Sequence, residues 1–203
     1  ETGRVLINGI PTSELSLTWM RKRIAFVTQN TFLFSDTVRN NLTIGLEEHE
    51  IPDEDEFIRI LKACACDFVF QMPMGLDTFL EENGNNLSGG QRQALTLLMA
   101  TLNRPKLLLL DEHTAALDPK TAAKVLTLSD KIVAEQNLTT LMVTHNMRDA
   151  IVHGNRLIMM NEGQVILDIS GEEKKNLTVE DLLEKFEEIS GEEFANDKAL
   201  LSK

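Results

Sequence analysis

The sequence has no tyrosine, only two cysteines, and no apolar run long enough to cross a bilayer. Cys64 and Cys66 lie two residues apart in an alanine-rich stretch, which argues against a disulfide framework and favours a reducing, cytosolic compartment. A C-x-C pair can hold a metal ion, but the sequence has no second Cys or His pair that would complete such a site. We therefore interpret both thiols as helix-packing residues. No signal peptide is visible.

The chain carries an excess of acidic residues. Its 203 residues include 32 acids and 20 bases, which gives a formal charge of −12. This balance argues against nucleic acid or an anionic membrane surface as the main partner. Hydrophobic residues make up 42% of the chain, enough to build a core for one or two subdomains.

Apolar strands alternate with amphipathic helices along the chain. Asp118-Pro119 is an N-cap followed by a proline at the first helical position, so a helix begins there. Strands are expected at 4–8, 24–27, 106–110 and 139–143, and helices at 17–23, 91–102 and 118–136. The runs at 106–110 and 139–143 are typical of strands buried in a parallel sheet. The alternation predicts an α/β domain.

Two regions depart from this alternation. The region 31–100 is predicted to be a helical insertion, in which Asp36 caps a short helix. A longer helix in it places four residues on one face, namely Phe57, Ile60, Leu61 and Cys64. A hairpin is expected with strands at 156–160 and 164–168.

The C-terminal tail is acidic and amphipathic. One helix is expected in which the apolar residues lie on one face, namely Leu182, Leu183, Phe186 and Ile189. A second helix is expected near Ser190. The tail is either a regulatory or docking element or a packed extension, and we favour the packed extension. The expected parts are an N-terminal portion of the α/β core at 1–30, a helical subdomain at 31–100, the remainder of the core at 101–170 and the tail at 171–203.

Two motifs carry the chemistry of the chain. Residues 87–94, Leu-Ser-Gly-Gly-Gln-Arg-Gln-Ala, form a turn that opens a helix, and such a turn offers backbone N–H groups and the positive end of a helix dipole to an anion. The apolar run at 107–110 ends in Asp111-Glu112, an arrangement that places carboxylates beside a metal-bound phosphate. Together they indicate a nucleotide-handling protein.

With these motifs in place, residues 3–168 resemble the nucleotide-binding domain of an ATP-binding cassette (ABC) ATPase. The resemblance rests on five motifs in the family's order: Gln29 as the Q-loop, 87–94 as the signature, 107–112 as the Walker B strand, 115–118 as the D-loop and His145 as the switch histidine. It implies a P-loop NTPase (RecA-like) parallel sheet, here partial, with an inserted helical subdomain and a C-terminal helical tail.

The resemblance also implies roles for these residues, with ATP and Mg²⁺ as cofactors. Asp111 is expected to hold Mg²⁺, with Gln29 touching the metal ion or the attacking water. Glu112 is expected to polarise that water, and His145 to bond the γ-phosphate. His113 replaces a residue that is often Pro or Ala in the family, and we interpret it as a variant rather than a ligand.

A second group of residues is expected to act on a neighbouring domain. In the family, the signature grips the γ-phosphate of a nucleotide held by a second, facing domain, which assigns that contact to Ser88, Gly89, Gly90 and Gln91. Asp118 is expected to shape the seam between the two domains.

One family motif does not occur in the sequence. None of the eleven glycines begins a Gly-x-x-x-x-Gly-Lys-Ser/Thr phosphate loop, and this motif belongs upstream of the strand at 4–8. We therefore expect the chain to be a fragment truncated before that loop (Walker A) and inactive in ATP hydrolysis on its own.

The two halves of the chain resemble different classes within the family. Residues 26–42 and 78–84 are similar to exporter-type domains, whereas residues from the signature onward are similar to the ATPase subunits of tryptophan-type importers. A natural recombinant, an engineered chimera and a mis-joined reading frame all remain open as explanations, as does the choice between importer and exporter.

The expected function is that of an ATP-binding and ATP-hydrolysing subunit or domain of an ABC transporter, which couples MgATP-driven dimerisation to translocation of a substrate. Its expected partners are a second nucleotide-binding domain and a transmembrane subunit or domain, and its expected place is the cytoplasmic face of a membrane. Two alternatives are a non-catalytic chain that supplies only a signature half-site, and a soluble ABC ATPase that acts outside transport.

Overall fold

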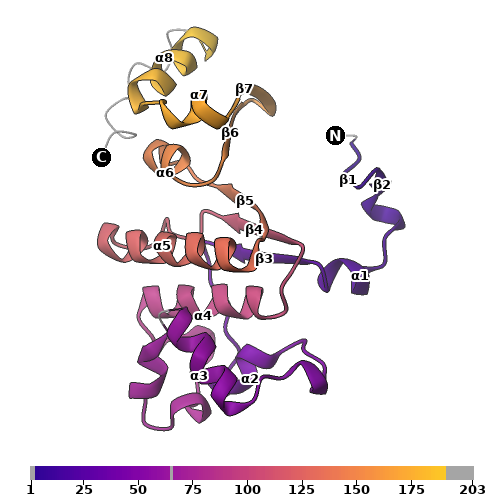
Figure 1. Ribbon diagram of the computed structural model, residues 1–203, viewed down its shortest axis with the longest axis vertical. Coiled ribbons are helices and arrows are strands. Elements are labelled where there is room, and N and C mark those ends of the chain that lie inside the picture. Colours follow the sequence, from indigo (N-terminus) through magenta and orange to yellow (C-terminus); the bar gives the residue numbers. More distant parts are fainter. Residues whose placement is uncertain (1–2, 65, 191–203) are drawn as a thin grey trace. The chain divides into compact units, whose positions relative to one another are not determined.

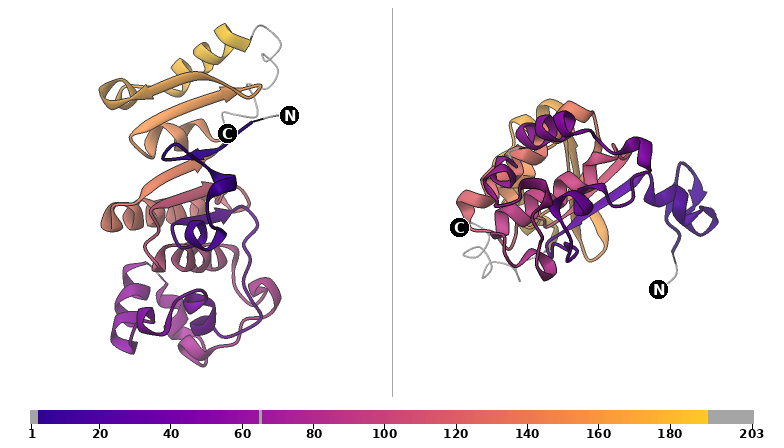
Figure 2. Two further views of the ribbon diagram at one scale, coloured as in Figure 1. Left: turned by 90° about the vertical axis from the view of Figure 1, so that its right-hand side faces the viewer. Right: turned by 90° about the horizontal axis from the view of Figure 1, so that it is seen from below.

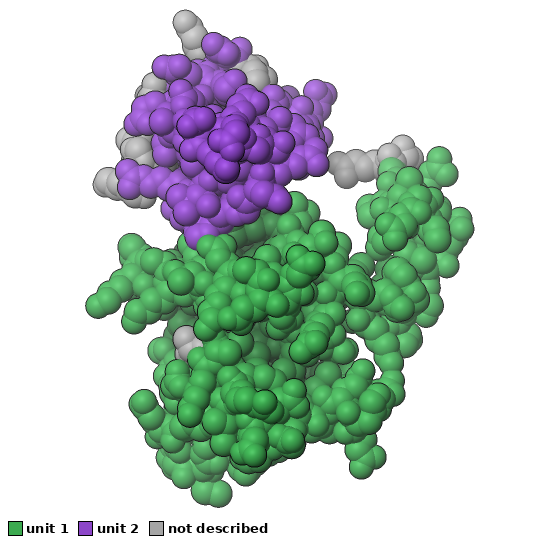
Figure 3. Space-filling model, in the orientation of Figure 1, with its two compact units in different colours: residues 1–142 green, residues 143–203 purple. Residues whose placement is uncertain are grey.

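The computed structural model describes residues 3–64 and 66–190. The chain falls into two compact units, residues 1–142 and residues 143–203 (Figure 3). None of the described helices is both long and apolar enough to cross a membrane.

A three-stranded sheet lies at the centre of the first unit. It consists of β3 (Ile24–Thr28), β4 (Leu107–Asp111) and β5 (Thr139–Val143), with β4 in the middle (Figure 1). β3 and β4 run parallel, although they are far apart in the sequence, and Thr28 lies opposite Asp111. The carboxyl ends of these two strands therefore meet at one edge of the sheet.

The two faces of this sheet differ in burial. Val27, Leu108 and Leu110 belong to a buried core that also contains Leu95, Leu97 and Leu98 of one helix and Leu128 and Ile132 of another. On the opposite face Phe26 is 55% exposed, and Leu141 of β5 is 53% exposed. The prediction of a fully buried strand at 139–143 is therefore wrong for the described chain, because helices cover only one of its faces.

The two core helices lie side by side (Figures 1 and 2). They are α4 (Gly89–Leu102) and α5 (Pro119–Gln136). Ser88 caps α4, and Asp118 caps α5 by accepting a hydrogen bond from the Thr121 N–H at 3.1 Å. α5 ends at Asn137, whose left-handed φ of 52° stops the helix. The Asp118 cap confirms the predicted start of α5, whereas α4 begins at Gly89, two residues before the predicted start at residue 91.

The insertion between β3 and α4 is largely helical, as predicted. It contains α2 (Val38–Thr43) and α3 (Glu54–Ala63), together with the short 3₁₀ turns Glu48–Glu50, Asp67–Gln71, Gly75–Asp77 and Glu82–Gly84. Phe57, Leu61 and Cys64 are buried on one face, as the pattern predicted.

The cap of α2 differs from the prediction by one residue. Thr37 caps the helix through the Asn40 N–H, at 3.1 Å. The Asp36 carboxylate instead accepts hydrogen bonds from the Thr37 N–H and the Asn40 side chain. Asp36 therefore supports the cap from outside the helix.

The N-terminal segment forms a short β-hairpin whose turn has two residues. β1 (Leu6–Ile7) pairs antiparallel with β2 (Ile10–Pro11), and a 3₁₀ turn (Thr12–Glu14) and α1 (Leu17–Arg21) follow. The turn is Asn8-Gly9, with φ of 51° and 80°, so the strand expected at 4–8 ends before Asn8. Two consecutive positive φ values suit Asn-Gly, because these residues tolerate the left-handed region best.

The second unit is built on the predicted hairpin. β6 (Arg156–Asn161) and β7 (Gln164–Ser170) pair antiparallel, flanked by α6 (Met147–Val152), α7 (Gly171–Lys175) and α8 (Val179–Ser190). Leu182 of α8 is 1% exposed, as expected for a packed helix. The Ile189 side chain and the helix expected after Ser190 lie outside the described residues.

Candidate functional site

Two predicted site segments meet at the carboxyl edge of β3 and β4. Gln29 follows β3 directly, and Glu112 follows Asp111 at the end of β4. Because Thr28 and Asp111 are register partners, these side chains start from neighbouring strand ends. The side chains of Gln29 and Asp111 are exposed, and neither takes part in the side-chain hydrogen bonds or ion pairs found among the described residues. Both are therefore available to a ligand at this edge.

The chain turns sharply at Glu112. Its φ is 46°, in the left-handed region that glycine favours, and its carbonyl accepts a hydrogen bond from the Ala115 N–H at 2.9 Å. A second turn follows, in which the Leu117 N–H donates to the Thr114 carbonyl at 3.0 Å. Backbone strain of this kind is typical of functional sites, since the surrounding structure must maintain it.

The signature stretch, residues 87–94, forms the start of α4. The Ser88 hydroxyl accepts a hydrogen bond from the Gln91 N–H at 3.3 Å, and the Gln91 side chain accepts one from the Ser88 N–H at 2.9 Å. This capping box leaves the N–H groups of Gly89 and Gly90 without acceptors inside the helix. The α4 N-terminus therefore presents hydrogen-bond donors and a positive dipole end to an anion.

The signature glycines allow α4 to approach the start of α5 closely. A Cβ atom added to Gly90 would lie 2.4 Å from Cγ2 of Thr121, and one added to Gly89 would lie 3.1 Å from Cδ2 of Leu117. The signature stretch and the predicted D-loop therefore pack against each other in the same unit.

Asp118 sits in this contact region as the exposed cap of α5. Hydrogen bonds from the Thr121 side chain and its backbone N–H lower the pKa of the Asp118 carboxyl. The cap is therefore held by the charged form of the side chain, and lowering the pH through its depressed pKa removes that stabilisation.

Two buried polar residues near the site were not assigned a role from the sequence. The Gln93 side chain, 2% exposed, donates to the Thr28 carbonyl at 3.4 Å and so ties the signature helix to the residue before Gln29. His113 is also 2% exposed, and its Nε2 lies 3.0 Å from the Ser129 hydroxyl oxygen. For Gln93, the available signal is a polar residue one helical turn before Leu97, in a helix rich in leucine.

His145 belongs to the second unit, where it is exposed and follows β5. The next residue, Asn146, caps α6 by accepting hydrogen bonds from the N–H groups of Arg148 and Asp149. At the other end of α6, the Lys174 ammonium donates to the carbonyls of Ile151 and His153. Both ends of the helix after the predicted switch histidine are thus fixed within this unit.

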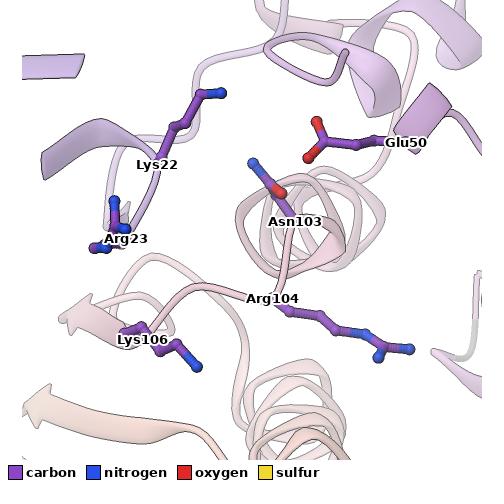
Figure 4. Close-up of a pocket in the computed structure, with 6 residues that line it drawn as sticks. All are labelled: Lys22, Arg23, Glu50, Asn103, Arg104 and Lys106. Atoms are coloured by element: carbon purple, nitrogen blue, oxygen red, sulfur yellow. The ribbon is translucent and has the colours of Figure 1, made fainter. Parts of the chain in front are cut away.

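A shallow basic pocket lies at the opposite edge of the sheet from Asp111. It is lined by Lys22, Arg23, Glu50, Asn103, Arg104 and Lys106 (Figure 4). Arg23 immediately precedes β3 and Lys106 immediately precedes β4, so the pocket adjoins the amino ends of these strands. None of the predicted site residues lines this pocket.

Comparison with known proteins agrees with this arrangement. Residues 1–115 match the family described as ABC transporter. The chain is 49% identical, over 75% of its length, to a tyrosine transport ATP-binding protein of Clostridioides difficile. It is 39% identical, over 81% of its length, to an ATP-dependent lipid A-core flippase of Albidiferax ferrireducens. It therefore belongs to the ABC transporter family, which implies nucleotide binding.

A solved structure shows the same fold. A bacterial Atm1-family ABC exporter with ATP bound matches 94% of this chain with a TM-score of 0.73 and 26% identity. The predicted α/β class with a parallel sheet is confirmed. The chain spans 61% of the length of the tyrosine transport protein, 28% of the flippase and 33% of the exporter chain.

Proposed function

We propose that this chain is part of an ATP-binding and ATP-hydrolysing subunit or domain of an ABC transporter. Its parent protein couples the MgATP-driven association of two such domains to translocation of a substrate, at the cytoplasmic face of a membrane. The observation that carries the proposal is the meeting of Gln29 with Asp111 and Glu112 at the carboxyl edge of β3 and β4. In open α/β sheets, ligands bind at this edge.

The residues at this edge suit a magnesium ion. Mg²⁺ prefers hard oxygen ligands and is usually bound by one or two carboxylates, with phosphates and waters completing its shell. Asp111 offers an exposed carboxylate and Gln29 an exposed amide oxygen. Bound Mg²⁺ would neutralise charge on the phosphates.

Glu112 is the proposed water-activating residue. Its carboxylate follows the strand end directly, and the hydrogen-bonded turn at its carbonyl fixes the backbone from which the side chain extends. A carboxylate in this position can orient and polarise a water molecule for attack on the γ-phosphate. His145 is proposed to donate a hydrogen bond to that phosphate.

The signature stretch is proposed to act on a nucleotide held by a second nucleotide-binding domain. The Ser88 hydroxyl and the first N–H groups of α4 would contact the γ-phosphate of that nucleotide. Asp118 would lie at the seam between the two domains, because its helix packs against the signature glycines. A transmembrane subunit or domain is the proposed partner of the helical insertion.

A complementation assay tests the signature role. The complete tyrosine transport ATP-binding protein of Clostridioides difficile would carry an arginine at its own signature serine, so that its homodimer cannot hydrolyse ATP. Adding the present chain should restore Mg²⁺-dependent hydrolysis, and the chain carrying Ser88→Arg should not. Ser35→Arg, at an exposed serine outside the motifs, is the matched control and should restore activity fully. Equal activity with Ser88→Arg would overturn the proposal.

A further inference from the structure

His113 is buried directly behind the two acids of the site. It follows Glu112 in the sequence and is 2% exposed, and it contacts Ser129 of α5, which is 4% exposed. Burying an imidazole is costly unless its polar atoms are hydrogen-bonded. The 3.0 Å separation of His113 Nε2 and Ser129 Oγ therefore marks a specific contact between the residue that follows the acid pair and the middle of α5.

The hydrogen-bond network defines the direction of this contact. The Ser129 hydroxyl donates its single proton to the Val125 carbonyl at 2.9 Å. Its oxygen can then only accept from His113, which requires a proton on Nε2. Nε2–H therefore donates to Ser129, and the assignment follows from the network around the hydroxyl.

This contact completes a brace across the connection between β4 and α5. One end of the connection is held where Asp118 caps the first turn of α5. The other end is held where His113 reaches Ser129, further along the same helix. Leu117, which packs against the signature glycine Gly89, lies between these two ends, and the strained residue Glu112 immediately precedes His113.

We propose that His113 is a positioning residue, which through Ser129 holds the turn at Glu112 and the connection to Asp118 in one arrangement. This inference rests on the proposed function, because it assigns the brace to the nucleotide site. The imidazole does not contact nucleotide in this role. It acts by fixing the backbone that carries the water-activating carboxylate and the residues that face the second domain.

Hydrogen exchange tests the brace without reference to activity. The Ala115 N–H, bonded to the Glu112 carbonyl, reports on the turn, and the Phe57 N–H, bonded to the Asp53 carbonyl in α3, serves as the reference. His113→Leu should accelerate exchange at Ala115 about tenfold and leave Phe57 unchanged, since one buried hydrogen bond is lost. Unchanged exchange at Ala115, or equal acceleration at both amides, would overturn the proposal.

Conservative and double variants separate the hydrogen bond from packing. His113→Gln places an amide N–H near the position of Nε2 and should keep Ala115 exchange within about threefold of the original chain. Ser129→Ala should behave like His113→Leu, and the double variant should be no worse than either single variant because all three remove the same contact. Additive effects would show that the two residues act separately.

The complementation assay then connects the brace to function. His113→Leu should lower the restored kcat about tenfold, on the same hydrogen-bond basis, and leave the KM for ATP unchanged, because the second domain binds the nucleotide. His113→Gln should restore kcat. If the unmodified chain restores no hydrolysis, the proposed function fails, and exchange at Ala115 still decides whether the brace exists. Because the second domain holds the hydrolysed nucleotide, this assay reports on the signature stretch and the connection to Asp118, and a normal kcat for His113→Leu would refute the link of the brace to those residues.

Discussion

The contact between Gly90 and Thr121 can be tested by adding one methyl group. Gly90→Ala places a Cβ atom 2.4 Å from Cγ2 of Thr121. Carbon atoms in contact lie about 3.5 to 4 Å apart, so the two helix starts must separate by roughly 1 Å. Thr121 cannot easily rotate away, because its side chain and N–H hold the Asp118 carboxylate.

The expected cost follows from two opposing effects. Overpacking of this kind costs about 1 to 3 kcal/mol in free energy of unfolding. Replacing glycine by alanine in a helix stabilises it by up to about 1 kcal/mol. Gly89→Ala gains the same propensity, but its Cβ meets only the movable end of Leu117, at 3.1 Å. Gly90→Ala should therefore be less stable than Gly89→Ala by about 1 to 3 kcal/mol.

Urea denaturation followed by far-UV circular dichroism measures this difference. Thr121→Ser removes Cγ2 and keeps the hydroxyl, so in its background the gap between Gly90→Ala and Gly89→Ala should shrink below about 0.5 kcal/mol. The reasoning would be refuted if the two alanine variants were equally stable in the original chain, or if Thr121→Ser left the gap unchanged.

Three further predictions concern the core and the second unit. Leu98→Ala, at a position 1% exposed, should lower the free energy of unfolding by about 2 to 5 kcal/mol in the same urea assay. Burial raises the pKa of Cys64 to about 11 and of Cys66 to about 12, so a thiol reagent at pH 8 should modify them only after unfolding. In the unfolded chain both thiols ionise at their ordinary pKa of 9.0, so the free energy of unfolding should fall as the pH rises above 9.0. A free energy of unfolding that does not change with pH in this range would contradict the prediction. Lys174→Met removes the donors that hold the last carbonyls of α6, so exchange at the Ala150 N–H should accelerate, whereas Lys62→Met at an exposed lysine should leave it unchanged.

Local patterns predicted much of the fold and the placement of the acids. The N-cap at Asp118 marked the start of α5, because a cap depends on neighbours within one turn. Asp111 was predicted at the end of a strand because the apolar run 107–110 precedes it, whereas the pairing of that strand with β3, which brings Thr28 opposite Asp111, joins residues far apart in the sequence.

Other features depend on contacts between distant residues. The apolar run of β5 predicted burial, but which sheet face is covered depends on helices elsewhere, and Leu141 is 53% exposed. The signature glycines indicated an anion-binding turn, whereas the close approach of Gly90 to Thr121 appears only in three dimensions. Gln93 and His113 likewise find partners 65 and 16 residues away, which no local pattern specifies.

Photolabelling tests most directly whether the signature stretch of this chain contacts a nucleotide held by another domain. An ATP analogue with an azide on its γ-phosphate would be bound to the complete Clostridioides difficile relative, mixed with the chain in Mg²⁺ and irradiated. Label is predicted within residues 88–92 of the chain, only in the mixture, and lost with Ser88→Arg. Equal labelling of the chain alone, or label confined to residues outside the signature stretch, would contradict the account.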